Sequence, residues 1–153
     1  LGFDASDAQL SAMNARLQAV LAIEGSAERR LAIWLHGEDC AAACTALQTA
    51  LPLPKRYRYW LQLIADYGDA IRRWHELDGE ARWMLLKASG SLRAEGDVLT
   101  LAQVMQVDAA LYAGVKNARE RVRALSLEEL TAQYRGAELG EAIRRVQILC
   151  LNA

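Results

Sequence analysis

The chain has 153 residues and 53% of them are hydrophobic, so it can bury a sizeable core in one domain or in two small ones. Eighteen basic residues against nineteen acidic ones give a net charge of −1, which excludes a strongly electropositive nucleic-acid binder and leaves only local basic surfaces. Three cysteines without framework spacing exclude a disulfide scaffold, and no apolar run approaches the roughly 20 residues of a membrane span. We therefore expect a cytoplasmic protein without membrane contacts. Because the sequence opens on Leu1, we also expect it to be a piece of a longer protein.

The first third of the chain predicts three helices. Apolar residues recur every three or four positions from Ser6 to Ile23, which is typical of an amphipathic helix. Ser26 is suited to cap a second helix, and Gly37 ends it. An alanine-rich third helix is expected from Asp39 to Ala50.

A rigid turn at residues 51–54 precedes a long helix. Pro54 suits the first position of that helix, and Trp60, Leu61 and Ile64 share its apolar face. Asp78 is expected to cap the next helix, which runs through Leu86. The polar stretch Ser89-Gly90-Ser91 is interpreted as the boundary between two subdomains.

The second half predicts further helices. Residues 97–122 carry an apolar pattern that suits two of them, and Ser126 with Glu129 has the form of a capping box at the start of a short one. No stretch alternates with period two, so no sheet is expected. The predicted fold is all-α, an irregular bundle of about seven to nine helices in two packed subdomains, residues 1–90 and 91–153.

Three segments resemble, in order, the C-terminal helical part of bacterial class II CCA-adding enzymes, which are tRNA nucleotidyltransferases. The first two are Ala27–Gly37 (AERRLAIWLHG) and Leu51–Arg58 (LPLPKRYR). The third and most specific is Tyr134–Arg145 (YRGAELGEAIRR), which is similar to a Gly-x-x-Gly-x-Glu-Leu-Gly-x-Ala-Ile segment near that family's C-terminus. Gln133 and Tyr134 stand where the family usually has its first glycine, so the match is incomplete there.

The resemblance implies a division of labour within the parent protein. An N-terminal head of that family binds Mg²⁺ and ATP or CTP and adds C, C and A to the tRNA 3′ end, while the helical body and tail hold the tRNA. This chain has no Asp-x-Asp pair after a Gly-Ser turn, the pattern that would hold two metal ions about 4 Å apart. We therefore expect a fragment without a catalytic site or cofactor of its own, whose partners are tRNA and the head, and which binds no DNA.

Local basic faces are the candidate RNA-binding sites. Lys55 and Tyr59 share a helix face that Arg56 and Arg58 flank, and a basic face with an aromatic ring can hold phosphates and stack on a base. Further candidates are two clusters of cations expected to be exposed: Lys116, Arg119 and Arg123; and Arg135, Arg144 and Arg145. Glycines near the second cluster allow close approach of an anion to the backbone. For all these faces an ordinary solvated surface is the simpler interpretation. The four tryptophans are interpreted as core residues.

Two other functions remain open. The same arginines suit a protein-interaction module for an acidic partner, which the near-neutral net charge favours. A metal-dependent phosphohydrolase is the weakest alternative, because His36 is followed by Gly37 rather than by the required aspartate. His36, Cys40 and Cys44 recur every four residues, but a fourth ligand is not evident, so we expect no metal site.

Overall fold

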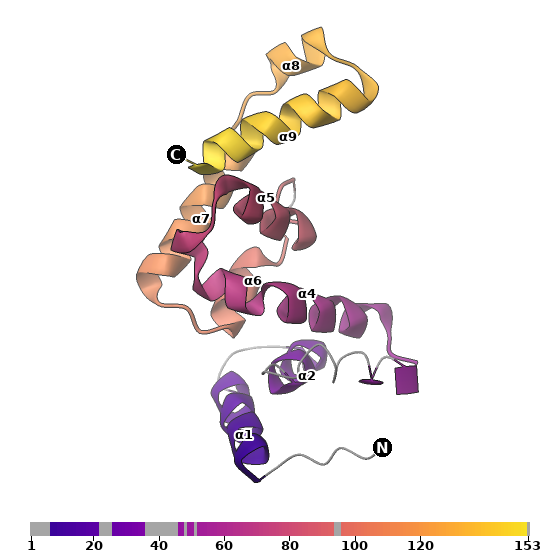
Figure 1. Cartoon of the computed structure of the whole chain (residues 1–153), viewed down its shortest axis with the longest axis vertical. Helices are drawn as coiled ribbons and strands as arrows, with labels where there is room; N and C mark the ends of the chain where they lie inside the picture. The colour runs from indigo at the N-terminus through magenta and orange to yellow at the C-terminus, as the bar shows by residue number, and fades with distance from the viewer. Residues whose placement is uncertain are drawn as a thin grey trace. The chain divides into compact units, whose positions relative to one another are not determined.

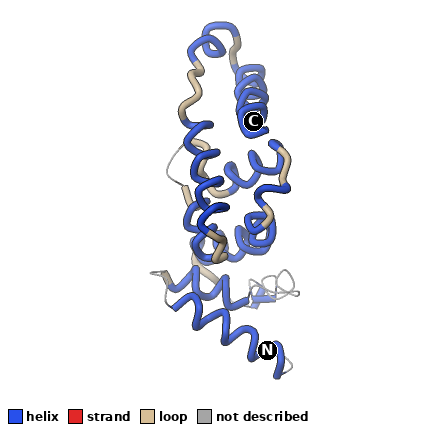
Figure 2. The backbone as a smooth tube through the Cα atoms, turned by 90° about the vertical axis from the view of Figure 1, so that its left-hand side faces the viewer, coloured by secondary structure: helices blue, strands red, loops and turns tan. Residues whose placement is uncertain are grey.

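The computed structural model describes residues 7–21, 26–35, 46–47, 49–50, 52–93 and 96–152. Over these ranges the regular structure is helical and no strand occurs, which confirms the all-α fold class (Figure 2). None of the helices in these ranges has both the length and the apolar character needed to cross a lipid bilayer. The helix expected at residues 39–50 lies largely outside the described residues.

The chain divides into two compact units. Unit 1 comprises residues 1–69 and 103–105, and unit 2 comprises residues 70–102 and 106–153. The sequence placed a boundary at residues 89–91 instead. Ser89 and Ser91 are buried within unit 2, where the Ser89 Oγ donates to the Leu85 carbonyl at 2.9 Å and the Ser91 Oγ accepts from the Val98 N–H at 3.1 Å. The stretch has the composition of a linker, but its two serine hydroxyls form hydrogen bonds within a packed turn.

Unit 1 is built from α1 (Asp7–Leu21), α2 (Ala27–Leu35) and most of α4 (Lys55–Arg72). α1 packs against α2 (Figure 1). Pro54 lies just before α4, and its carbonyl accepts from the Tyr57 and Arg58 N–H groups. The apolar face expected on α4 is confirmed, because Trp60, Leu61 and Ile64 are fully buried.

The described part of unit 2 contains the 3₁₀ turn η1 (Trp74–Glu76) and five helices. Its core consists of apolar side chains that recur every three or four residues along these helices. The helices are α5 (Gly79–Ala88), α6 (Val98–Val104, most of it in this unit), α7 (Ala109–Arg123), α8 (Glu128–Gln133) and α9 (Gly136–Asn152). α9 packs against α5, α7 and α8 (Figure 1). Each large aliphatic side chain in such a core contributes about 1.5–3 kcal/mol by leaving water.

The N-termini of two helices in unit 2 can be compared with the N-caps expected from the sequence. Asp78 precedes α5 and its Oδ1 accepts from the Ala81 N–H at 2.8 Å, which confirms the predicted cap. The capping box at Ser126 is wrong. α8 starts at Glu128 with Leu127 as its N-cap and without a side-chain cap, so the Ser126 hydroxyl lies one residue too early to reach the first helical N–H groups.

Candidate nucleic-acid interface

The site begins with the close approach of α5 to α9 in unit 2. The Gly79 N–H donates to the Asn152 Oδ1 at 2.6 Å, and a Cβ at Gly79 would lie 2.5 Å from the Ile148 carbonyl oxygen. Only glycine allows this contact, because the Ile148 carbonyl is backbone and cannot move aside. Further along, Trp83 meets Gln147, so the two helices run antiparallel.

Arg82 fastens the same end of the pair. Its Nη1 donates to the Leu151 carbonyl at 2.7 Å, and its Nε donates to the Trp74 carbonyl at 3.3 Å. The last carbonyls of a helix have no partner within the helix, so a guanidinium there satisfies an acceptor that burial would otherwise leave orphaned. The end of α9 is therefore fixed against the start of α5.

Trp83 lies at the centre of the site. Its indole Nε1 donates to the Gln147 Oε1 at 2.9 Å. Two cations lie over its ring: the Lys87 Nζ is 4.9 Å and the Arg144 Cζ is 5.3 Å from the ring centroid. Each such cation–π contact contributes about 0.5–1 kcal/mol at an exposed position. The interpretation of the tryptophans as core residues is confirmed for Trp60 and Trp74, which are buried, whereas Trp34 and Trp83 are only partly buried.

A hollow of about 320 Å³ opens beside this indole, and we call it the Trp83 hollow. Its walls come from the last turns of α5, the following turn, and the middle of α9. They are formed by Trp83, Lys87, Gly90, Leu92, Arg93, Gly140, Ile143, Arg144 and Gln147. Among the wall residues that the structure describes, three are cations and none is a carboxylate, so this part of the hollow is suited to an anion.

The turn that carries Leu92 and Arg93 is held firmly. The Ser91 N–H donates to the Leu86 carbonyl at 2.7 Å, and the Asp97 N–H donates to the Ser89 carbonyl at 2.7 Å. Gly96 has a φ of +55°, and a Cβ there would lie 2.5 Å from the Ser91 backbone nitrogen. These contacts hold residues 89–91 and 96–97 in a closely packed arrangement.

The cations of the Trp83 hollow differ in how far they are neutralised. Arg144 is ion-paired with Glu80, and its Nη1 also lies 3.3 Å from the Glu141 Oε1. The pKa of Glu141 is lowered from its usual range, first by a hydrogen bond from Arg145 and then by the charge of Arg144. Lys87 and Arg93 form no ion pair with any residue that the structure describes. They supply the uncompensated positive charge.

The basic face expected on α4 is present in unit 1. Lys55, Arg56 and Arg58 are exposed, whereas Tyr59 is half-buried with its ring edge-on to Trp60 at 5.7 Å. The Arg56 Nε is 3.0 Å from the Glu28 Oε1. The pKa of Glu28 is lowered, mainly by a hydrogen bond at its own backbone and in smaller part by Ser26 and Arg56. Arg56 is thus largely neutralised.

The cations expected on α7 do not form one exposed cluster. Lys116 pairs with Glu120 at 4.0 Å, and Arg123 is exposed. Arg119 is only 8% exposed, and its Nε and Nη2 have no hydrogen-bond partner among the residues that the structure describes. The expectation that Arg119 is exposed is wrong, because it belongs to the stripe in which Val115, Ala118 and Val122 are also buried.

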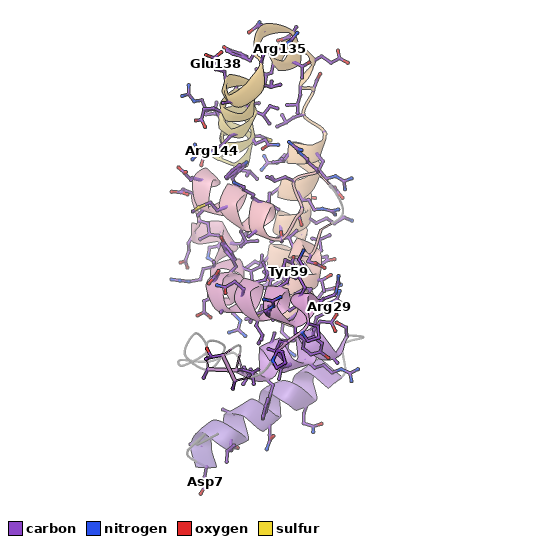
Figure 3. The ribbon with its side chains drawn as sticks, turned by 90° about the vertical axis from the view of Figure 1, so that its right-hand side faces the viewer. Asp7, Arg29, Tyr59, Arg135, Glu138 and Arg144 are labelled. Carbon is purple, nitrogen blue, oxygen red and sulfur yellow. The ribbon has the colours of Figure 1, made fainter. Side chains whose placement is uncertain are left out.

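The second expected cluster is also separated. Arg135 lies at the start of α9 while Arg144 lies further along it (Figure 3). The Arg135 Nη1 donates to the Thr131 and Tyr134 carbonyls, so this guanidinium caps the end of α8. The Arg145 Nε is 3.2 Å from the Glu141 Oε1. Of the ten residues proposed from the sequence, only Arg144 lines the Trp83 hollow.

Sequence reasoning missed Trp83, Lys87, Arg93 and Gln147. A local signal existed, since Trp83 and Lys87 are four residues apart on one helix and Arg93 follows closely. What was lacking was the partner helix, because the Trp83 hydrogen bond spans 64 residues of sequence.

Metal ligands give no second candidate site. His36, Cys40 and Cys44 lie outside the described residues. Among those that the structure does describe, no three His, Cys, Asp or Glu side chains gather closely enough to hold a metal ion.

Comparison with known proteins adds no relative: no family model, no curated protein and no solved structure matches this chain.

Proposed function

We propose that the chain is an RNA-binding helical module whose ligand is tRNA, and that the Trp83 hollow in unit 2 binds the RNA backbone. The observation that carries the proposal is the composition of this hollow: its described walls hold three cations and one indole and no carboxylate. Cations that meet phosphates supply most of the affinity for RNA, and an exposed aromatic ring adds stacking.

The resemblance of Tyr134–Arg145 to the tail of CCA-adding enzymes supports tRNA as the ligand. Three residues of that segment, Gly140, Ile143 and Arg144, line the Trp83 hollow. A Cβ at Gly140 would meet no atom within 4 Å, so packing does not require glycine there. An open position beside cations is suited to the close approach of a phosphate. We propose in addition that the parent protein is a tRNA nucleotidyltransferase whose catalytic residues and Mg²⁺ belong to another part of it.

Each unit, taken by itself, also carries exposed cations away from the Trp83 hollow. Lys55, Arg58 and Arg123 are exposed and form no ion pair with a described residue. They are suited to secondary phosphate contacts, which position an RNA without reading its sequence. Arg56, Arg135 and Arg145 are already engaged by the protein and contribute less.

The proposal is tested by measuring the affinity of the chain for a tRNA that lacks its 3′ CCA and for a single strand of equal length. We expect the chain to prefer the folded tRNA, because double-stranded RNA is recognised by its shape and backbone. Changing Lys87 and Arg93 together to Ala should weaken tRNA binding roughly 5- to 50-fold at 0.1 M salt. The matched control is Arg73→Ala with Arg121→Ala, which removes the same charge from two exposed positions outside the Trp83 hollow and should change little.

Two results would contradict the proposal. Equal affinity for both RNAs, unchanged in the Lys87/Arg93 variant, would remove the case for RNA. The second result is that the chain binds poly-glutamate tightly, loses this binding in the Lys87/Arg93 variant, and shows no preference for tRNA. It would favour the alternative function, an interaction module for an acidic protein.

A further inference from the structure

We infer that the Trp83 hollow is a subsite for one unpaired nucleotide, whose base stacks on Trp83 and whose phosphate meets Lys87 and Arg93. The inference rests on the proposed RNA-binding function and deepens it, because phosphate binding alone requires neither an indole nor a hollow. The shared chemistry is a nucleobase attached to a phosphate, which an extruded residue of RNA or a free mononucleotide can supply.

The volume suits one nucleotide. At about 320 Å³ the Trp83 hollow is at the lower end of the range of about 300–1,000 Å³ for small-molecule sites. Its walls combine apolar groups, including Leu92 and Ile143, with convergent polar ones. A base fills the apolar part, and its phosphate remains at the cationic rim.

The two cations over the indole differ in how firmly they are held. Arg144 is fixed by Glu80 and Glu141, whereas among the described residues Lys87 has only its contact with the Trp83 ring. An exposed lysine side chain that loses a single cation–π contact moves at small cost. An incoming base can therefore take the place of Lys87 on the ring, and the ammonium group turns to the phosphate.

Gln147 supplies a specific donor. It is only 8% exposed, and its Oε1 is occupied by the Trp83 indole N–H. This bond orients the amide, whose Nε2 has no hydrogen-bond partner among the described residues. A free amide donor beside a stacking ring is suited to a ring nitrogen or carbonyl oxygen of a base.

The test is equilibrium binding of four probes to the full chain: AMP, CMP, ribose 5-phosphate and inorganic phosphate. We expect AMP and CMP to bind roughly 5- to 100-fold tighter than ribose 5-phosphate, because stacking adds to the phosphate contact. Trp83→Leu should abolish this preference while leaving the ribose 5-phosphate affinity within about twofold. Trp83→Phe should keep most of it, because the phenyl ring still offers a stacking face.

A second measurement uses Gln147→Glu, which keeps the shape and the acceptor for Trp83 but replaces the donor with a negative charge. It should weaken AMP more than ribose 5-phosphate. Circular dichroism of each variant checks that its helices are formed, and Lys87→Ala provides a variant at an exposed position that leaves the α5–α9 packing intact.

The outcomes separate the inference from the proposed function. If tRNA competes with AMP and both need Trp83, both stand. Suppose that AMP and ribose 5-phosphate bind with equal affinity, while changing Lys87 and Arg93 to Ala still weakens tRNA binding. RNA binding then stands, and the nucleotide subsite is overturned. If AMP binds through Trp83 but tRNA neither binds nor competes, the site takes a free nucleotide and RNA as its source is overturned. If none of the probes and no tRNA binds, both are overturned.

Discussion

Arg119 and Arg123 are one helical turn apart on α7, yet their environments are opposite. Arg123 is exposed, whereas Arg119 is 8% exposed, with two nitrogens that find no hydrogen-bond partner in the described part of the chain. A buried polar group without a partner costs about 1–3 kcal/mol relative to one that is satisfied, and more when it is charged. Arg119 therefore weakens unit 2, while Arg123 is available to a ligand.

Replacing Arg119 with Met should raise the free energy of unfolding by about 1–3 kcal/mol, because an apolar side chain of similar length removes the unsatisfied donors. The measurement is urea denaturation followed by far-ultraviolet circular dichroism. Arg123→Met is the control and should stay within about 0.5 kcal/mol of the unchanged chain. A clear loss of stability in Arg119→Met would mean that the guanidinium is satisfied in solution.

At the scale of the element, the pairing of α5 with α9 forms the candidate site. The walls of the Trp83 hollow come from both helices and from the turn after α5, so any change that separates the helices also opens the hollow. Two glycines of this pair, Gly79 on α5 and Gly140 on α9, are not equivalent. Gly79 is in tight contact with the Ile148 backbone, whereas Gly140 has open space around its Cα.

Gly79→Ala should therefore destabilise the chain by about 1–3 kcal/mol, since the added methyl group must push α9 away from α5. Gly140→Ala is the matched control and should be neutral or stabilising by up to about 1 kcal/mol, because alanine is the better helix former and meets no neighbour. Thermal unfolding of both variants provides the measurement. Equal effects of the two changes would contradict the packing of Gly79 against Ile148.

A contact could be predicted from the sequence when the residues that form it are close together along the chain, and could not when they are far apart. The Asp78 cap and the apolar stripe of α4 follow from residues within one or two turns, and both were predicted. The Trp83 hollow depends on contacts between α5 and α9, such as the Trp83–Gln147 hydrogen bond, which joins residues 64 apart in sequence. Helical periodicity predicts which face of a helix is buried, but not which other helix packs against that face. Arg144 could therefore be named as a candidate cation from the sequence, but its position beside Trp83 could not be predicted.

At the scale of the whole molecule, the net charge of −1 limits how RNA can be held. A chain without overall positive charge gains little from long-range attraction and depends on a few local contacts. Lys87 and Arg93 are uncompensated, and Arg144 is shared with two carboxylates. About three phosphates is therefore a reasonable count for the Trp83 hollow and its surroundings.

Salt dependence measures this count directly. Each neutralised phosphate contributes about −0.7 to −0.9 to the slope of log affinity against log salt, so three give a slope of about −2 to −3. Raising the salt concentration fourfold should then weaken tRNA binding roughly 20- to 40-fold. Lys87→Ala with Arg93→Ala should bring the slope to about −1, whereas Arg73→Ala with Arg121→Ala should leave it unchanged. A slope steeper than about −6 would require a broad basic surface, which a chain of this charge does not offer, and a slope near zero would mean that phosphates are not what it binds.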